Sequence, residues 1–201
     1  MRKSFEIAIN IFQKNHGILR FSVARNLGIN PKTLVDMVDA GILVKEARGI
    51  YRLAELEPPG NPDLVYVMQK VPSAVICLVS ALAFYDMTTQ IPYRVYIALS
   101  SQERNKPKIK YPPIEVFWYG KKAHGAGIIH IDIDGFKVPI YCIEKTIADC
   151  FKFRNKIGKD IAIEALRSYM ISRERDIPKL VRYASIDQVD RVIRPYIDAL
   201  I

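Results

Sequence analysis

At 201 residues, the chain is long enough for two compact units of unequal size, and half of its residues are hydrophobic, which is ample for buried cores. Thirty Lys and Arg against 21 Asp and Glu give a formal net charge of +9, which favours a polyanionic partner, nucleic acid first. The most apolar run, residues 74–85, is too short to cross a bilayer, and residues 5–12 form an amphipathic pattern rather than a signal peptide. The cysteines Cys77, Cys142 and Cys150 have no metal-ligand spacing and indicate reduced core thiols. We therefore expect a cytoplasmic protein without membrane association.

The first 41 residues predict a helix-turn-helix. Apolar residues recur at helical spacing over 5–12, and this helix is expected to end near Gly17. Ser22 is expected to cap a short second helix that stops at Gly28. Asn30 and Pro31 then predict the start of a third helix, because Asn caps free amides and Pro suits the first helical position. The turn at residues 27–30 is short and contains glycine, as such connections do.

A two-stranded hairpin with a basic tip is predicted next. Residues 42–46 and 50–53 are rich in strand-forming side chains and are separated by Ala47-Arg48-Gly49. Three short helices followed by a hairpin predict a winged helix-turn-helix DNA-binding domain over residues 1–57. Three prolines and a glycine at 58–62 predict a linker.

Residues 63–201 predict an α+β domain. Helices are expected at 64–71 and 73–85, and again from residue 143 onward, where apolar residues return to helical spacing. Between them, residues 94–99, 114–119, 128–134 and 136–141 predict strands, and Asp134-Gly135 predicts a tight hairpin turn. We expect a mostly antiparallel sheet flanked by helices, and the fold class of the whole chain is α+β.

The helix-turn-helix supplies candidate DNA-contacting residues, because the start of the recognition helix meets base edges while neighbouring elements hold phosphates. Solvated surface side chains and a protein-docking module are the alternatives. The base-reading candidates project from the third helix, the phosphate candidates surround the second, and the hairpin candidates would reach the flanking backbone or minor groove. In that order they are Lys32, Thr33 and Asp36; Arg20, Ser22 and Arg25; and Arg48, Tyr51 and Arg52.

A second basic stretch, residues 101–113, is interleaved with prolines and contains Glu103 as its single acid. Charge repulsion and proline favour an extended segment, which is consistent with a phosphate-binding arm and equally with a solvated connector. Its cations are Arg104, Lys106, Lys108 and Lys110, and Lys121 and Lys122 continue the basic character in the next loop.

No enzyme mechanism or cofactor is indicated. The acids Glu115, Asp132, Asp134 and Glu144 raise the alternative of a metal-dependent nuclease. However, Glu144 and Lys145 are adjacent, so they would point to opposite faces of a strand, and Asp132 and Asp134 sit beside a turn where solvated acids are common. The three histidines have no zinc spacing, and no nucleophile motif is present. We expect no catalytic residue, metal or cofactor.

Taken in order, these motifs resemble the AbiEi family of type IV antitoxins over nearly the whole chain. The winged-helix stretches that resemble it are residues 28–34, 41–43 and 48–53. In the larger domain, residues 88–92, 112–114, 131–135, 145–152, 154–158 and 194–196 are similar to family signatures. Phe21 departs from the pattern, since a small capping residue is expected there.

The resemblance implies an antitoxin of an abortive infection system that counters a co-encoded nucleotidyltransferase-like toxin and represses its own operon by binding promoter DNA. It also implies that the larger domain carries antitoxin activity. The basic loop and the segment with Lys145, Lys152, Arg154 and Lys156 are then candidates for an antitoxin or phosphate-binding surface. The alternatives are a stand-alone regulator whose second domain senses a ligand or dimerises, and a DNA-targeted nuclease. The oligomeric expectation is a monomer in solution or a dimer on DNA.

Overall fold

The computed structural model describes residues 2–103 and 105–200, and its chain folds into two compact units. The first unit contains the chain up to Pro72 together with Ile109–Pro112 and Asp132–Lys137, and the second contains the remainder. The domain bounds expected from the sequence, 1–57, 58–62 and 63–201, stay a prediction. Both units combine helices with a sheet, so the α+β class is confirmed.

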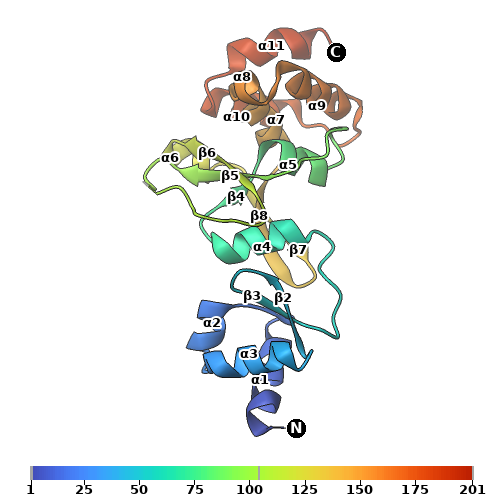
Figure 1. Ribbon diagram of the computed structural model, residues 1–201. Coiled ribbons are helices and arrows are strands. Elements are labelled where there is room, and N and C mark those ends of the chain that lie inside the picture. Colours follow the sequence, from blue (N-terminus) through green and yellow to red (C-terminus); the bar gives the residue numbers. More distant parts are fainter. Residues whose placement is uncertain (1, 104, 201) are drawn as a thin grey trace. The chain divides into compact units, whose positions relative to one another are not determined.

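The first unit contains a helix-turn-helix and a three-stranded antiparallel sheet of order β1-β3-β2 (Figure 1). Phe12, Leu34 and Met37 are fully buried and join its helices in one core. The elements are α1 (Lys3–Lys14), β1 (Ile18–Arg20), α2 (Phe21–Asn26), α3 (Pro31–Asp39), β2 (Leu43–Ala47), β3 (Ile50–Leu53) and α4 (Pro62–Lys70).

Two local expectations for this unit are wrong. Ser22 does not cap α2, because the helix already begins at Phe21 and Arg20 occupies the capping position. Residues 18–20, for which no strand was expected, pair with β3, so the wing sheet has a third strand. Phe21 follows that strand directly, and its backbone amide donates to the Gly49 carbonyl at 2.8 Å.

The second unit has a five-stranded mixed sheet of order β6-β5-β4-β8-β7. Its strands are β4 (Val75–Ile76), β5 (Val95–Ser100), β6 (Ile114–Tyr119), β7 (Ile128–Ile133) and β8 (Phe136–Tyr141), and the tip of the β7–β8 hairpin is counted with the first unit. The expectation of a mostly antiparallel sheet is wrong, because β5 pairs with β6 and β4 with β8 in parallel. The helix expected at 73–85 is shorter, since Val75 and Ile76 form the central strand β4, antiparallel to β5.

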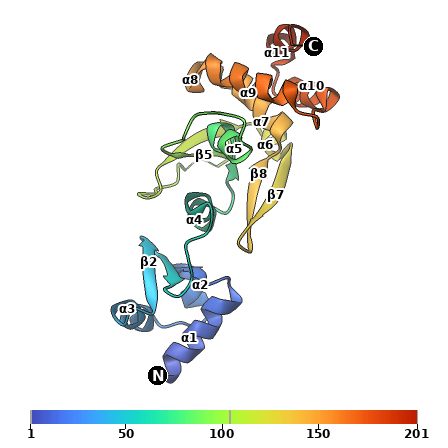
Figure 2. The same cartoon turned by 90° about the vertical axis from the view of Figure 1, so that its right-hand side faces the viewer.

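Helices pack beside this sheet around one buried helix, α7. In both ribbon views α7 lies between α5 and the pair α9 and α10 (Figure 2), and it contacts all three. Eight of its ten residues are buried, which explains why apolar and polar side chains alike are enclosed there. The helices are α5 (Leu78–Phe84), α6 (Lys121–Gly125), α7 (Ile143–Lys152), α8 (Arg154–Ile157), α9 (Lys159–Ile171), α10 (Ile177–Ile186) and α11 (Asp190–Asp198).

Candidate nucleic-acid interface

The third helix of the first unit begins as the sequence predicts. The side chain of Asn30 accepts a hydrogen bond from the Lys32 backbone amide at 2.9 Å, and Pro31 occupies the first turn. Gly28 has φ +90°, the left-handed conformation that a glycine adopts without strain, and the amide of Ile29 then donates to the Ala24 carbonyl at 3.0 Å. Ile29 is buried in the core. These contacts stabilise the turn that leads from α2 into α3.

The predicted base-reading residues on α3 differ in their exposure and in their ion pairing. Lys32 is exposed, and Thr33 is half-buried. Asp36 is half-buried and forms an ion pair with Arg2, with 2.9 Å between Nη1 and Oδ2. Lys32 is therefore the cation at the start of α3 with its charge open to solvent.

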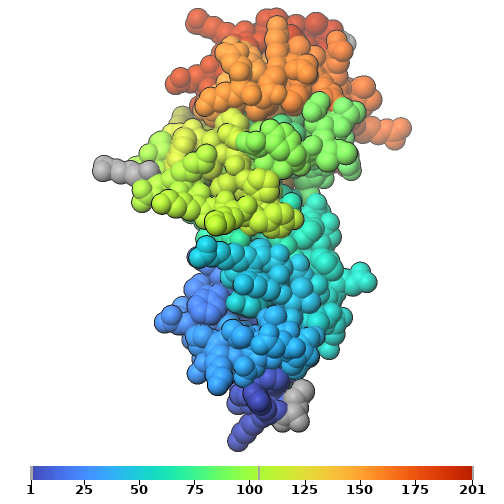
Figure 3. Space-filling model, viewed as in Figure 1, coloured from blue at the N-terminus to red at the C-terminus, as the bar shows by residue number. Residues whose placement is uncertain are grey.

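Around α2, the phosphate candidates Ser22 and Arg25 are exposed. Arg20 is half-buried, and its Nη1 lies 3.4 Å from the Gln69 carbonyl oxygen of α4. Helices α2 and α3 form part of the surface of the first unit in the space-filling view (Figure 3). Ser22 and Arg25 are thus open to contact by the phosphate backbone of a nucleic acid that lies beside α3.

At the hairpin, Arg48 is exposed at the tip, where Gly49 adopts φ +77°. Tyr51 and Arg52 are buried, which corrects their placement on a DNA-facing surface. Arg52 pairs with Glu46, and its Nη1 donates to the carbonyls of Leu53, at 3.0 Å, and Leu56. Every residue of β3 is buried, so these side chains support the wing rather than project from it.

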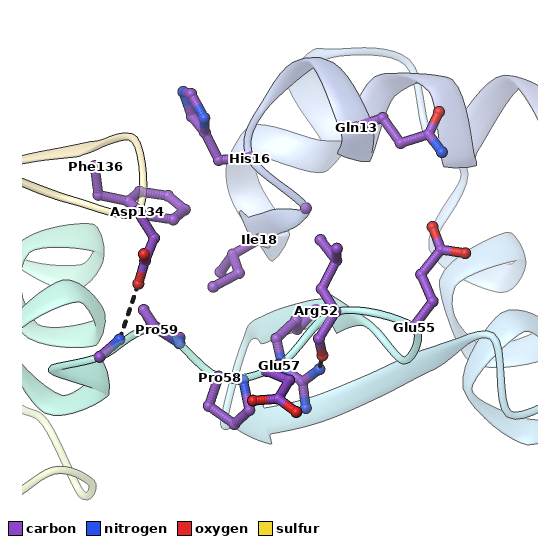
Figure 4. A pocket seen from close by; sticks show the side chains of 13 residues that line it. Gln13, His16, Ile18, Arg52, Glu55, Glu57, Pro58, Pro59, Asp134 and Phe136 are labelled. Atoms are coloured by element: carbon purple, nitrogen blue, oxygen red, sulfur yellow. Dashed lines mark hydrogen bonds between the residues drawn. The ribbon is translucent and has the colours of Figure 1, made fainter.

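Beside the wing, the first unit has an open pocket of about 640 Å³ (Figure 4). Asp134 accepts a hydrogen bond from the Gly60 amide at 2.9 Å, and the rings of His16 and Phe136 meet edge to face with their centroids 5.5 Å apart. The charged lining residues include Arg52, which is already paired with Glu46, and the exposed acid Glu57. This lining shows no cluster that selects one class of ligand.

In the basic loop and its surroundings, the structure separates surface cations from buried ones. Lys106, Lys108, Lys110 and Lys156 are exposed, whereas Arg104 lies outside the described residues. Arg154 is half-buried, and its Nη1 donates to the Phe151 carbonyl at 2.7 Å. Lys145 is fully buried, so it cannot belong to an antitoxin or phosphate-binding surface as the sequence suggested.

Lys145 instead joins two carboxylates inside the second unit. Its Nζ contacts Asp149 Oδ1 and lies 3.0 Å from Asp187 Oδ2, and all three side chains are fully enclosed. Lys152, at the rim with 28% of its side chain exposed, binds the other Asp187 oxygen at 3.2 Å. Burial opposes the charge of Lys145, but attraction to Asp149 and Asp187 outweighs it and raises the lysine pKa.

The two acids of this cluster are not equivalent. Burial raises the pKa of the Asp149 carboxyl well above its ordinary value, Lys145 opposes that shift, and Asp187 adds to it. Asp149 Oδ2 is buried without a hydrogen-bond partner among the described residues. The local sequence suggested a role for Lys145, but it gave no signal for Asp187, which is 42 residues further on.

The four acids considered for a nuclease do not converge. Glu115 pairs with Arg94, and Glu144 Oε2 lies 3.0 Å from Lys179 Nζ. Asp132 Oδ1 accepts from the Gly135 amide at 2.8 Å, which stabilises the hairpin turn. Over residues 2–103 and 105–200, no three His, Cys, Asp or Glu side chains are grouped so that they could hold a metal ion. Across the same residues, no helix has both the length and the apolar character needed to span a membrane.

The first unit thus combines three short helices with a three-stranded antiparallel sheet, and an exposed lysine lies at the start of α3, an arrangement typical of the winged helix-turn-helix class. Residues 6–54 match a family model described as the transcriptional regulator AbiEi antitoxin. The resemblance found in the sequence is therefore confirmed for the N-terminal region, and for the larger domain it stays a prediction. A search of curated proteins found no match to the chain.

Proposed function

We propose that this protein is a DNA-binding autorepressor and the antitoxin of a type IV abortive infection system, without catalytic activity of its own. The observation that carries the proposal is the Asn30-capped recognition helix, with Lys32 exposed, inside the region that matches the regulator family. Lys32 and Thr33 would meet base edges, while Ser22, Arg25 and Arg48 would hold phosphates on either side. The partner on the DNA side is the promoter of its own operon.

The antitoxin part of the proposal assigns the larger domain to a co-encoded nucleotidyltransferase-like toxin, which it would counter directly or indirectly. Its support is the order of family-like motifs beyond residue 63. The acids considered for catalysis have separate partners, which favours a binding role over hydrolysis.

A reporter placed behind the native promoter tests the repressor function. Wild-type protein should lower reporter output, and Lys32→Ala with Arg48→Ala should restore it, because a base contact and a phosphate contact are both lost. Arg191→Ala with Arg194→Ala removes two exposed positive charges from α11 and serves as the control, which should repress like wild type. Equal repression by all three proteins would contradict the assignment of the interface.

Co-expression tests the antitoxin function. The neighbouring gene alone should arrest growth, and the full chain should relieve the arrest even with Lys32→Ala and Arg48→Ala, because those changes lie outside the larger domain. A neighbouring gene without toxicity, or an arrest that the wild-type chain fails to relieve, would overturn this part and favour a stand-alone regulator.

A further inference from the structure

The second unit carries two thirds of the excess positive charge of this protein. That unit contains 18 Lys and Arg against 12 Asp and Glu, so it carries six of the nine excess positive charges. The winged-helix unit, for which DNA binding is proposed, carries the other three. An excess of positive charge favours non-specific binding to a polyanion, and most of it lies outside the winged-helix unit.

Three of these cations are open to solvent along the edge strand β6. Lys121 and Lys122 begin α6, two and three residues after β6 ends at Tyr119, and Lys156 lies with its Nζ 5.8 Å from the centre of the Phe117 ring. All three are exposed, and among the described residues none forms an ion pair. We call Lys121, Lys122 and Lys156 the β6 lysine row.

Lys152 lies beside the β6 lysine row but is not free to bind. Its Nζ is 5.4 Å from the centre of the Tyr119 ring, and it binds Asp187, whose other oxygen holds Lys145. Asp187 is thereby neutralised and cannot compensate the exposed lysines. Glu115, on the same strand, is likewise paired with Arg94.

The basic loop that follows β5 starts at the end of the sheet where β6 leads into α6. Strands β5 and β6 are parallel, with Ser100 opposite Tyr119, so their carboxyl ends coincide. The Ser101 amide donates to the Tyr119 carbonyl at 2.7 Å, which fixes the start of the loop beside α6. The loop acid Glu103 accepts a hydrogen bond from the Ser73 hydroxyl at 2.9 Å.

The side chains indicate which polyanion fits. Lysine is depleted at protein interfaces, where exposed aromatic anchors are enriched. Phe117 and Tyr119, the aromatic side chains beside these lysines, are buried, and the exposed Trp118 between them belongs to the opposite face of the strand. Single-stranded nucleic acids bind by stacking their bases on exposed aromatic rings. Here Lys156 lies over the ring of Phe117 and Lys152 over the ring of Tyr119, so bases cannot stack on these two rings. What remains is a row of point charges, which suits the phosphates of a duplex.

We propose that the β6 lysine row is a second nucleic-acid contact, which binds the phosphate backbone of duplex DNA without sequence preference. It goes beyond the winged-helix interface and uses a different unit of the chain. Within the row, Lys121 and Lys122 together contribute about 1.8 to the slope of log K against log salt, since each phosphate contact contributes about 0.9.

The test uses the full chain with Lys32→Ala and Arg48→Ala, so that binding through the winged helix is weakened, and a random-sequence DNA duplex. Between 50 and 200 mM salt, this protein should lose roughly 12-fold more affinity than the same protein carrying Lys121→Ala and Lys122→Ala. Lys156→Ala alone removes one contact instead of two, so it should lower the salt slope by about 0.9. Arg191→Ala with Arg194→Ala is the charge-matched control and should leave the slope unchanged.

Three results would overturn the proposal: no duplex binding at 50 mM salt, equal slopes with and without Lys121 and Lys122, or an equal loss in the α11 control. Poly-glutamate should bind at least tenfold more weakly than the duplex, and equal binding would also contradict a phosphate site. Failure of the winged-helix proposal would appear separately, as promoter binding that Lys32→Ala and Arg48→Ala do not reduce.

Discussion

Replacing Lys145 by Met tests the buried charge cluster. The substitution keeps an unbranched side chain, one atom shorter, but removes a cation that is fully enclosed between Asp149 and Asp187. Asp187 retains Lys152 at 3.2 Å, whereas Asp149 loses its ion-pair partner, and its Oδ2 has no hydrogen-bond partner within residues 2–103 and 105–200. Breaking such a buried pair costs about 3–5 kcal/mol of the free energy of unfolding. The melting temperature should fall by about 6–20 °C in a protein of this size.

Part of that loss should return in Lys145→Met with Asp149→Asn. Asn removes the carboxyl that would be buried without a countercharge, so we expect a recovery of about 1–3 kcal/mol. The single tryptophan, Trp118, lies on β6 of the same unit, so urea unfolding followed by its fluorescence reports on this unit. The reasoning fails if Lys145→Met costs under about 1 kcal/mol, below the range for a broken buried pair, or if the double variant is less stable than the single one.

The pH dependence of the same measurement follows from the raised pKa of Asp149. A carboxyl whose pKa is higher in the folded state binds a proton there first, so its contribution to stability is complete below its unfolded pKa. That contribution is lost as pH rises through the folded pKa. Stability of the wild type relative to Asp149→Asn should therefore fall as pH rises above about 4. A constant or rising difference would contradict the direction of the shift.

Two local predictions concern caps and glycines. Asn30→Ala should lower the free energy of unfolding by about 1 kcal/mol, because it removes the acceptor for the Lys32 amide. Asn30→Asp should keep the cap, and equal melting temperatures for the two variants would contradict the capping role. Gly127→Ala should destabilise the chain more than Gly41→Ala, since both glycines have positive φ but only at Gly127 would a Cβ lie 2.7 Å from Lys145 Cβ. Thermal unfolding of the two variants checks the order, and an equal loss would count against the steric argument.

Features set by neighbouring residues were predictable from the sequence. Asn30 and Pro31 begin α3, and Asp134 and Gly135 form the turn between β7 and β8, because caps and tight turns depend on a few adjacent side chains. Strand β4 was missed because its two residues, Val75 and Ile76, stand inside an apolar run that suits a helix equally well.

Features set by distant residues were not predictable. The buried state of Arg52 depends on Glu46 and on the carbonyl of Leu56, which only the folded wing brings together. Lys145 meets Asp187 across 42 positions, and the parallel pairing of β5 with β6 depends on the path of the intervening loop. Within the candidate DNA interface, the sequence thus predicted the exposed positions Lys32 and Arg48 but misplaced Tyr51 and Arg52 on the surface.

Titration of the native promoter duplex with purified protein tests the central claim most directly. Wild-type protein should bind it more tightly than a scrambled duplex of equal length. Lys32→Ala should narrow that difference, and Arg48→Ala should weaken binding to both duplexes and lower the salt slope by about 0.9. Arg191→Ala with Arg194→Ala, on exposed α11, should leave the sequence preference unchanged. Equal binding of wild-type protein to the promoter and the scrambled duplex would contradict sequence-specific recognition by the winged helix.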